Sequence, residues 1–417
     1  MKNIIENIPF WLFAVVVFSL PFVNFPNLRN YGYSIQTTDL LFLLASLVWV
    51  IYLVLRKNKI RFSWFYLPLS LWFISLCLST YFSEDFRKSF IKLFGSTYLI
   101  GLAVLGFNLT DDEEKFRKLG IVWLSATFLV CLVSLMSLGL FYIQRDNFIL
   151  FSTLSHYGSL PAGNYPRVQS TFFNPNMLCN YLSISLIFLL LAFKLNWLRK
   201  SILLILSIFL ATTIFLTVSP GIGGILLIIG LWFWLDLKTV KPLFTKILSL
   251  NLLSKIFLVG GILSAVFFFL TTLPSPTNFP SKIEPSPRVL TWISALENFR
   301  NNPVLGRGIG LEAALVEYKA PSHQQVLADA HQLWFSVAAQ QGLVGVLAML
   351  FLVIWLFRRS LPLNLAESNN SVIKTGLCLA FISAFLYQGL GGSFEDARHL
   401  WVLIGLLASS TEENITI

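Results

Sequence analysis

Residues 332–357 read QLWFSVAAQQGLVGVLAMLFLVIWLF and are followed directly by Arg358 and Arg359. This stretch carries no charged residue, and as a helix it is long enough to cross about 30 Å of hydrocarbon. Similar apolar runs recur along the whole chain, which has 417 residues, is 56% hydrophobic and only 12% charged, and has a mean hydropathy of +0.74. A soluble core does not hide so much apolar surface, so the sequence predicts a polytopic membrane protein.

The apolar runs predict an all-α fold, a transmembrane bundle of about 12 helices. The predicted spans are 8–24, 37–55, 63–82, 89–108, 119–143, 173–193, 201–218, 221–236, 254–272, 332–357, 373–391 and 399–411. Two long polar loops divide the chain into N-terminal helices (1–143), central helices preceded by the loop 144–172 (144–272), a long helical loop (273–331) and C-terminal helices (332–417).

The basic residues predict how the spans are oriented. With the N-terminus in the cytoplasm, more than half of the 30 Lys and Arg fall on one side in short connections, where the positive-inside rule applies. These residues are Lys2, Arg56, Lys57, Lys59, Arg61, Lys115, Arg117, Lys118, Lys194, Arg199, Lys200, Lys238, Lys241, Lys246, Lys255, Arg358, Arg359 and Lys374. We therefore expect both termini in the cytoplasm and the loops 144–172 and 273–331 on the outer side.

Several functional classes are disfavoured by the same composition. The formal charge of +10 does not indicate nucleic-acid binding, because the basic residues cluster between apolar runs. The first run, 8–25, lacks a small-residue cleavage site and is expected to be a span, not a removed signal peptide. The four cysteines lie in apolar runs without paired spacing and are expected to be small core residues. They are Cys77, Cys131, Cys179 and Cys378.

All the histidines fall on the predicted outer side, where nucleotide-activated donors are absent. They are His156, His323, His331 and His399. The cytoplasmic connections are short and hold no phosphate-cradling glycine motif. If the protein performs chemistry, we therefore expect an outer-face reaction whose activated substrate arrives attached to lipid.

The long loop 273–331 contains a predicted surface helix. Residues 286–302 read SPRVLTWISALENFRNN, in which Ser286 suits the N-cap and Pro287 the first helical position. Apolar residues three or four apart make one stripe, which should lie along the membrane surface or on the bundle. The stripe comprises Val289, Trp292, Ile293, Leu296 and Phe299. Arg288 lies in the first turn, where it would either bind an anion or extend to lipid headgroups.

The end of this loop supplies two more candidates. Arg307 lies in the glycine-rich stretch 306–310, which is not a dinucleotide fingerprint, and it can bind phosphate or remain a solvated arginine. His331 opens the next span, and imidazoles exchange protons near neutral pH, so it can act as a base or have a structural role. Asp329 is close enough in sequence to orient the ring, although the two residues would not share a helix face.

The loop 144–172 ends near a third group of polar residues. Asn174 and Asn176 flank Pro175 at the mouth of a span, where their amides either bind sugar hydroxyls or cap the helix. Arg167 precedes them. The last outer turn, 395–399, reads EDARH and either joins the site or forms a solvated connection.

At these residues the chain resembles the O-antigen ligase and polymerase family of polytopic membrane glycosyltransferases. The resemblance covers much of residues 160–360. It rests on Arg167 with Phe173–Asn176, on the run from Arg288 to Gly310, on His331-Gln-Leu-Trp with Gln341–Gly345, and on Asp39 at the start of the second span. Each motif alone is weak, but their order and spacing together are fairly specific.

The resemblance implies transfer of a glycan from an undecaprenyl diphosphate carrier to an acceptor hydroxyl, on the periplasmic face of a bacterial inner membrane. It implies no cofactor and no metal, and an acceptor that is another glycan, a lipid A core or a protein. It also implies that Arg167 and Arg288 hold the diphosphate and that His331 is the base. Guanidinium groups suit this task, since the leaving diphosphate gains charge as the bond breaks.

One departure from the family pattern concerns the connection between two middle spans. Many relatives have Ser-Arg-Gly there, whereas this chain reads Ser219-Pro220-Gly221. The residues that can replace the missing arginine are Arg145, Arg307 and Arg398.

Three other readings remain. A transporter of a small anion or a lipid-linked saccharide would place ionisable groups and broken helices near the bilayer midplane, whereas these spans are nearly free of charge. A membrane scaffold leaves the arginines and histidine unexplained. A metal-dependent transferase needs a ligand set, but the acidic pairs Glu84-Asp85 and Glu395-Asp396 have no matching histidines.

Overall fold

The computed structural model describes residues 7–23, 28–30, 33–56, 60–143, 154–159, 163–239, 287–320, 323–361, 363–365 and 368–411. The predicted span 254–272, Arg145, Ser286 and the first part of the loop 273–331 lie outside these ranges.

The described chain is mostly helical. The helices are α2 (Ile8–Ser19), α3 (Thr37–Arg56), α4 (Tyr66–Tyr81), α5 (Phe86–Leu109), α6 (Glu113–Ile143), α7 (Pro175–Lys194), α8 (Lys200–Leu216), α9 (Ile222–Thr239), α11 (Pro287–Asn301), α12 (Leu333–Ser360), α13 (Asn369–Phe381), the π-helical turn η1 (Ile382–Tyr387) and α14 (Arg398–Thr411). Every predicted span within the described ranges therefore corresponds to a helix.

Fewer helices than the predicted 12 are long enough to cross a membrane within the described residues. Six described segments are long and apolar enough to cross a membrane, namely Thr37–Leu55, Phe86–Leu109, Glu113–Gly139, Pro175–Lys194, Leu333–Ser360 and Asn369–Tyr387. Four further apolar helices, α2, α4, α8 and α9, are shorter than a full crossing. The predicted count of about 12 spans is therefore not confirmed, although the protein has the composition and helices of a membrane protein.

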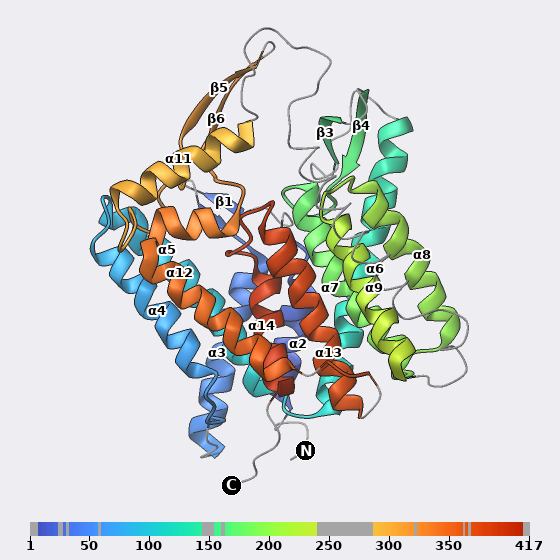
Figure 1. Ribbon diagram of the computed structural model, residues 1–417. Coiled ribbons are helices and arrows are strands. Elements are labelled where there is room, and N and C mark those ends of the chain that lie inside the picture. Colours follow the sequence, from blue (N-terminus) through green and yellow to red (C-terminus); the bar gives the residue numbers. More distant parts are fainter. Residues whose placement is uncertain are drawn as a thin grey trace.

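The fold is not purely α-helical, which corrects the prediction. Three antiparallel hairpins occur, in segments expected to be loops or loop helix. They are β1–β2 (Leu28–Asn30 with Tyr33–Ile35), β3–β4 (Leu154–Ser159 with Gly163–Val168) and β5–β6 (Val316–Ala320 with His323–Leu327). Each hairpin satisfies the backbone polar groups of a loop that leaves the bundle. The hairpins β3–β4 and β5–β6 lie at the same end of the molecule as α11 (Figure 1).

Helix α14 forms the centre of the bundle. It packs against α5, α12 and α13, and every residue from His399 to Ser409 is buried. A helix buried on all sides explains why this short segment is apolar all round. Gly405 lets α14 approach α5, since an added Cβ would lie 2.2 Å from the carbonyl oxygen of Ala103. In contrast, α3 exposes many apolar side chains, as expected of a helix that faces lipid.

Helix α12 is broken at Gly342, and the loop after α11 fills the break. Gly342 has φ 62° and ψ −159°, outside the helical region. Leu343 N donates to Pro303 O at 2.8 Å, and Arg307 N donates to Ala339 O at 3.0 Å. The stretch 303–308 thus takes over backbone partners that a continuous helix would supply, which fixes the outer end of α12 to the loop.

Gly342→Ala should destabilise the protein strongly. An added Cβ would lie 2.4 Å from Val304 C, in a backbone conformation that L side chains rarely adopt. We expect a cost of more than about 3 kcal/mol, because backbone clash adds to backbone strain. Gly95→Ala in α5 is the matched control, with no atom within 4 Å of the added Cβ, and should be neutral or stabilising. Thermal unfolding of both variants in detergent measures the difference; equal melting temperatures would contradict the expectation.

Candidate functional site

His331 is held by a carboxylate in the turn that precedes α12. Asp329 Oδ1 accepts from His331 N at 3.0 Å, and Asp329 Oδ2 lies 3.4 Å from His331 Nδ1. His331 has φ 50°, so the chain is not helical there, and helix α12 begins only at Leu333. The sequence argument that Asp329 and His331 do not share a helix face therefore does not apply. The carboxylate orients the ring at Nδ1 and leaves Nε2 for a substrate. The ring stays about half exposed.

A serine from the turn between η1 and α14 also contacts Asp329. Ser393 Oγ donates to Asp329 Oδ1 at 2.5 Å and lies 2.8 Å from Ser336 Oγ of α12. The turn between η1 and α14 is thereby tied to the residues that flank His331. We call Asp329, His331 and Ser393 the histidine unit.

The first turn of α11 lies against the same backbone. Thr291 Oγ1 bonds to Arg288 O at 2.8 Å and reaches Ala330 O at 3.4 Å, one residue before His331. Burial lowers the pKa of the Arg288 guanidinium, which means that its charge is partly removed from water. Arg288 thus starts from a turn in contact with the histidine unit.

Helix α11 begins at Pro287, as predicted from its position after Ser286, but a different face packs on the bundle. Thr291 and Ala295 are fully buried there, whereas Ile293 and Leu296 of the predicted stripe are exposed. Alanine and threonine permit the closer approach to α12, so the alternative that the stripe lies along the membrane surface stays a prediction for Ile293 and Leu296. Their exposed apolar side chains suit contact with the membrane interface.

Arg167 joins three elements on the other side of the site. Its Nε donates to Thr217 O, at the end of α8, and its Nη2 donates to Asn176 Oδ1, in the first turn of α7, each at 2.9 Å. Asn174 is the N-cap of α7, and its Oδ1 accepts from Met177 N at 2.8 Å. Of the two asparagines, Asn174 thus has a capping role. The side chain of Asn176 instead orients Arg167 and borders a cavity.

This small cavity lies between α7, the start of α9 and the turn after η1. It is lined by Asn176, Ser219, Pro220, Gly221, Tyr387, Gln388, Gly391 and Phe394. Phe394 follows Ser393 of the histidine unit directly, so a single outer turn contributes to both. Asn176, the partner of Arg167, and the turn that carries Ser393 therefore border the same cavity.

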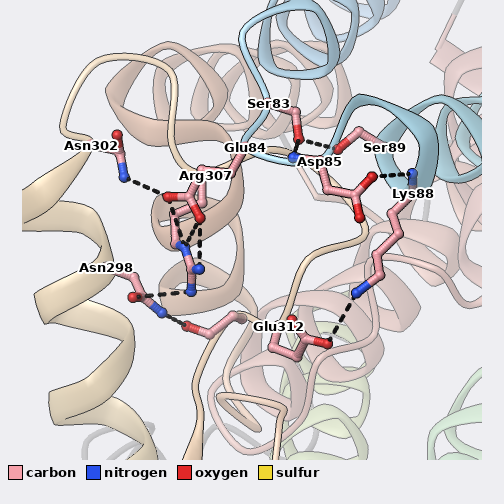
Figure 2. A network of polar contacts seen from close by, with 10 residues as sticks. Ser83, Glu84, Asp85, Lys88, Ser89, Asn298, Asn302, Arg307 and Glu312 are labelled. Atoms are coloured by element: carbon pink, nitrogen blue, oxygen red, sulfur yellow. Dashed lines mark hydrogen bonds and ion pairs between the residues drawn. The ribbon is translucent and has the colours of Figure 1, made fainter.

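Arg307 is engaged elsewhere. Its guanidinium forms an ion pair with Glu84, in the connection between α4 and α5, with Nη2 2.7 Å from Oε2 and Nε 3.0 Å from the same oxygen (Figure 2). Asn302 also donates to Glu84. The hydrogen bonds between Arg307 and Glu84 lower the pKa of Glu84 and raise the pKa of Arg307, and they outweigh the opposite effect of burial on each group. A diphosphate role for Arg307 stays a prediction, and it would require the fork to leave Glu84.

The last outer turn is not a plain solvated connection. Asp396 pairs with Lys92, and Arg398 Nη2 lies 2.8 Å from Asp39 Oδ1. His399 is buried, with Nε2 2.7 Å from Asn180 Oδ1, so it is not an outer-surface base. Burial, reinforced by Asp396 and Asp329, raises the pKa of Glu395 to about 8. The sequence showed that this turn is charged. It did not reveal that Asp396 and Arg398 form ion pairs or that His399 is buried.

The structure does not describe the side chains of two of the four histidines. These histidines are His156, whose backbone is part of β3, and His323, whose backbone is part of β6. Within the described residues, no group of three or more His, Cys, Asp or Glu could hold a metal ion.

The fold and the site define a polytopic helical membrane protein whose polar side chains gather at one end of the bundle. Residues 204–350 match the family model described as O-antigen ligase. The chain is 26% identical over 314 residues to the teichuronic acid biosynthesis protein TuaE of Bacillus subtilis (strain 168). That alignment covers 71% of this chain and 62% of the relative. The resemblance predicted from the sequence is confirmed over residues 204–350, which are similar to the O-antigen ligase family.

Proposed function

We propose that this protein is a membrane glycosyltransferase that moves a glycan from a polyprenyl diphosphate carrier to an acceptor hydroxyl on the outer face of the plasma membrane. The carrier is undecaprenyl diphosphate, and the acceptor is a growing glycan or a lipid A core. His331 is the base, and Arg167 and Arg288 hold the diphosphate. The O-antigen ligase match and the relative that acts in teichuronic acid biosynthesis support this class of substrate.

The observation that carries the proposal is the convergence of separate segments on His331. Thr291 of α11 reaches the backbone beside His331, and Ser393 of the last outer turn donates to Asp329. The next residue of that turn lines the cavity that Asn176 shares, and Asn176 binds Arg167. The segments that contain Arg288, His331 and Ser393 are therefore linked by hydrogen bonds. The Ser393 turn and Asn176, the partner of Arg167, border the same cavity.

The reaction balances with these groups alone. The acceptor oxygen attacks the anomeric carbon, the bond from that carbon to the phosphate oxygen breaks, and the bonding electrons leave with the diphosphate. The acceptor proton passes to the imidazole of His331, which Asp329 stabilises when charged. The guanidinium forks stabilise the negative charge of the leaving group. Arg167 and Arg288 thus act on the leaving group, and the histidine unit acts on the nucleophile.

A transporter of a small anion or a lipid-linked saccharide is the second candidate. It is disfavoured because the groups described above occur at one end of the bundle, not along a path between helices. The ion pairs Lys92–Asp396 and Arg398–Asp39 neutralise charges close to that end.

Purified protein with a synthetic lipid-linked oligosaccharide tests the proposal. We expect glycan transfer to a matching acceptor with release of polyprenyl diphosphate, and we expect turnover to persist in EDTA. A ligase adds one preassembled unit, whereas a polymerase yields a ladder of products, so product length separates the two. No transfer to any acceptor, together with uptake of the saccharide into vesicles, would favour the transporter instead.

A further inference from the structure

Three buried polar atoms near the outer end of α13 have no hydrogen-bond partner within the described residues. They are Ser383 Oγ and Tyr387 Oη, in the π-helical turn η1, and Gln388 Nε2, directly after it. Gln388 is 5% exposed. Buried polar groups are rarely left without a partner, because the loss of water contacts costs free energy. The donors of Tyr387 and Gln388 line a cavity and are therefore available to a ligand, and π-turns frequently occur at functional sites.

The start of α9 lies directly against the side chains of Tyr387 and Gln388. A Cβ on Gly221 would lie 2.7 Å from Gln388 Oε1, and a Cβ on Gly224 would lie 2.7 Å from Tyr387 Cδ1. Only glycine allows this approach. The carbonyl oxygen of the Gln388 amide thus faces α9, and Nε2 is the atom left to donate.

The cavity also contains the position at which relatives have an arginine. Pro220 lines it, between Ser219 and Gly221. Two of the residues that the sequence offered as substitutes already bind carboxylates, since Arg307 pairs with Glu84 and Arg398 pairs with Asp39.

A cationic group nevertheless lies beside the cavity. Asn176 lines it and accepts from Arg167 through Oδ1, so its own amide nitrogen remains to donate. An acceptor-rich anion would meet a fixed positive charge on one side and neutral donors on the other.

We propose that this cavity binds oxygen atoms of the donor's diphosphate, with the Tyr387 hydroxyl and the Gln388 amide donating in place of the arginine absent at position 220. The inference rests on the proposed function and adds the neutral half of the diphosphate site. Neutral donors hold the leaving group less tightly than a second arginine would, which favours release of polyprenyl diphosphate after transfer.

Equilibrium binding in nanodiscs tests this assignment, with undecaprenyl diphosphate and undecaprenyl monophosphate as probes. Tyr387→Phe removes only the hydroxyl, and Gln388→Leu removes only the amide. Each should weaken binding of the diphosphate lipid about tenfold and change binding of the monophosphate lipid less, because each removes a hydrogen bond to a charged group. Tyr81→Phe, on an exposed tyrosine at the end of α4, is the matched control and should change neither.

A rescue variant separates a lost donor from a damaged fold. Pro220→Arg in the Gln388→Leu background returns a donor to the cavity and should restore most of the lost affinity. Unchanged binding of the diphosphate lipid by Tyr387→Phe and Gln388→Leu would overturn the assignment, as would equal loss for both lipids. A glycan-bearing undecaprenyl diphosphate serves as a third probe. Loss of binding confined to this lipid would also overturn the assignment, since the cavity would then hold sugar.

These outcomes are distinct from failure of the proposed function. If Tyr387→Phe and Gln388→Leu bind normally while His331→Ala abolishes transfer, only the cavity assignment fails. If the wild-type protein binds the diphosphate lipid but transfers no glycan, the proposed reaction fails and the binding site stands.

Discussion

His331→Ala should abolish glycan transfer while the protein still folds and binds its lipid donor. A positioned general base contributes about a hundredfold to ten-thousandfold in rate. His399 cannot replace it, because His399 is buried against Asn180. The side chain is about half exposed in a turn, so its removal costs little packing. Initial rates with lipid-linked donor, measured together with donor binding, should show a fall in kcat and a nearly unchanged Kd.

The histidine unit offers graded variants. Asp329→Asn keeps a hydrogen-bond acceptor for His331 N and Ser393, but removes the negative charge that stabilises the protonated ring. It should therefore reduce kcat less than His331→Ala does. His323→Ala, in strand β6 of the same outer loop, is the control and should retain turnover. Full activity of His331→Ala would remove the base assignment.

Helix positions were predictable from the sequence because uninterrupted apolar runs have few alternatives in a bilayer. The start of α11 was equally accessible, since Pro287 suits the first helical position. Pairing between distant segments was not accessible in this way. Arg307 and Glu84 are 223 residues apart, and nothing near either residue announces the other.

The candidate site shows the same division. Sequence reasoning singled out Arg167, Arg288 and His331 as candidates, because cationic and titratable residues stand out in an apolar chain. It missed Tyr387 and Gln388, which look like ordinary residues near the end of a span. Their role depends on the approach of α9 at Gly221, a tertiary contact across more than a hundred residues that no local pattern encodes.

The three arginines also separate only in three dimensions. Arg167 borders the cavity through Asn176, Arg288 is partly buried beside the histidine unit, and Arg307 holds Glu84. A loop arginine with glycine neighbours and an arginine at a helix start look equally suited to phosphate in the sequence. Arg307 already makes an ion pair with Glu84, and that pair must be broken before a diphosphate can bind there.

Arg288→Ala should lower kcat/KM for the lipid-linked donor about a hundredfold to a thousandfold, comparable to removal of one donor that stabilises an oxyanion. Burial already lowers the pKa of this guanidinium, so its charge is screened weakly by water and acts strongly on the leaving diphosphate. Arg288→Lys keeps the charge but lacks the planar fork, and should recover only part of the loss. Arg300→Ala, on an exposed arginine in the last turn of α11, is the matched control.

Salt distinguishes a buried ligand from a surface attraction. If Arg288 acts within the site, the ratio of wild-type to Arg288→Ala activity should change little between low and physiological ionic strength, because partly buried charges are screened less. A ratio that collapses as salt rises would assign Arg288 to steering at the membrane surface, and equal activities of Arg288→Ala and Arg300→Ala would remove it from the diphosphate site. In either case the charge on the leaving group would have to be stabilised from the Arg167 side of the cavity alone.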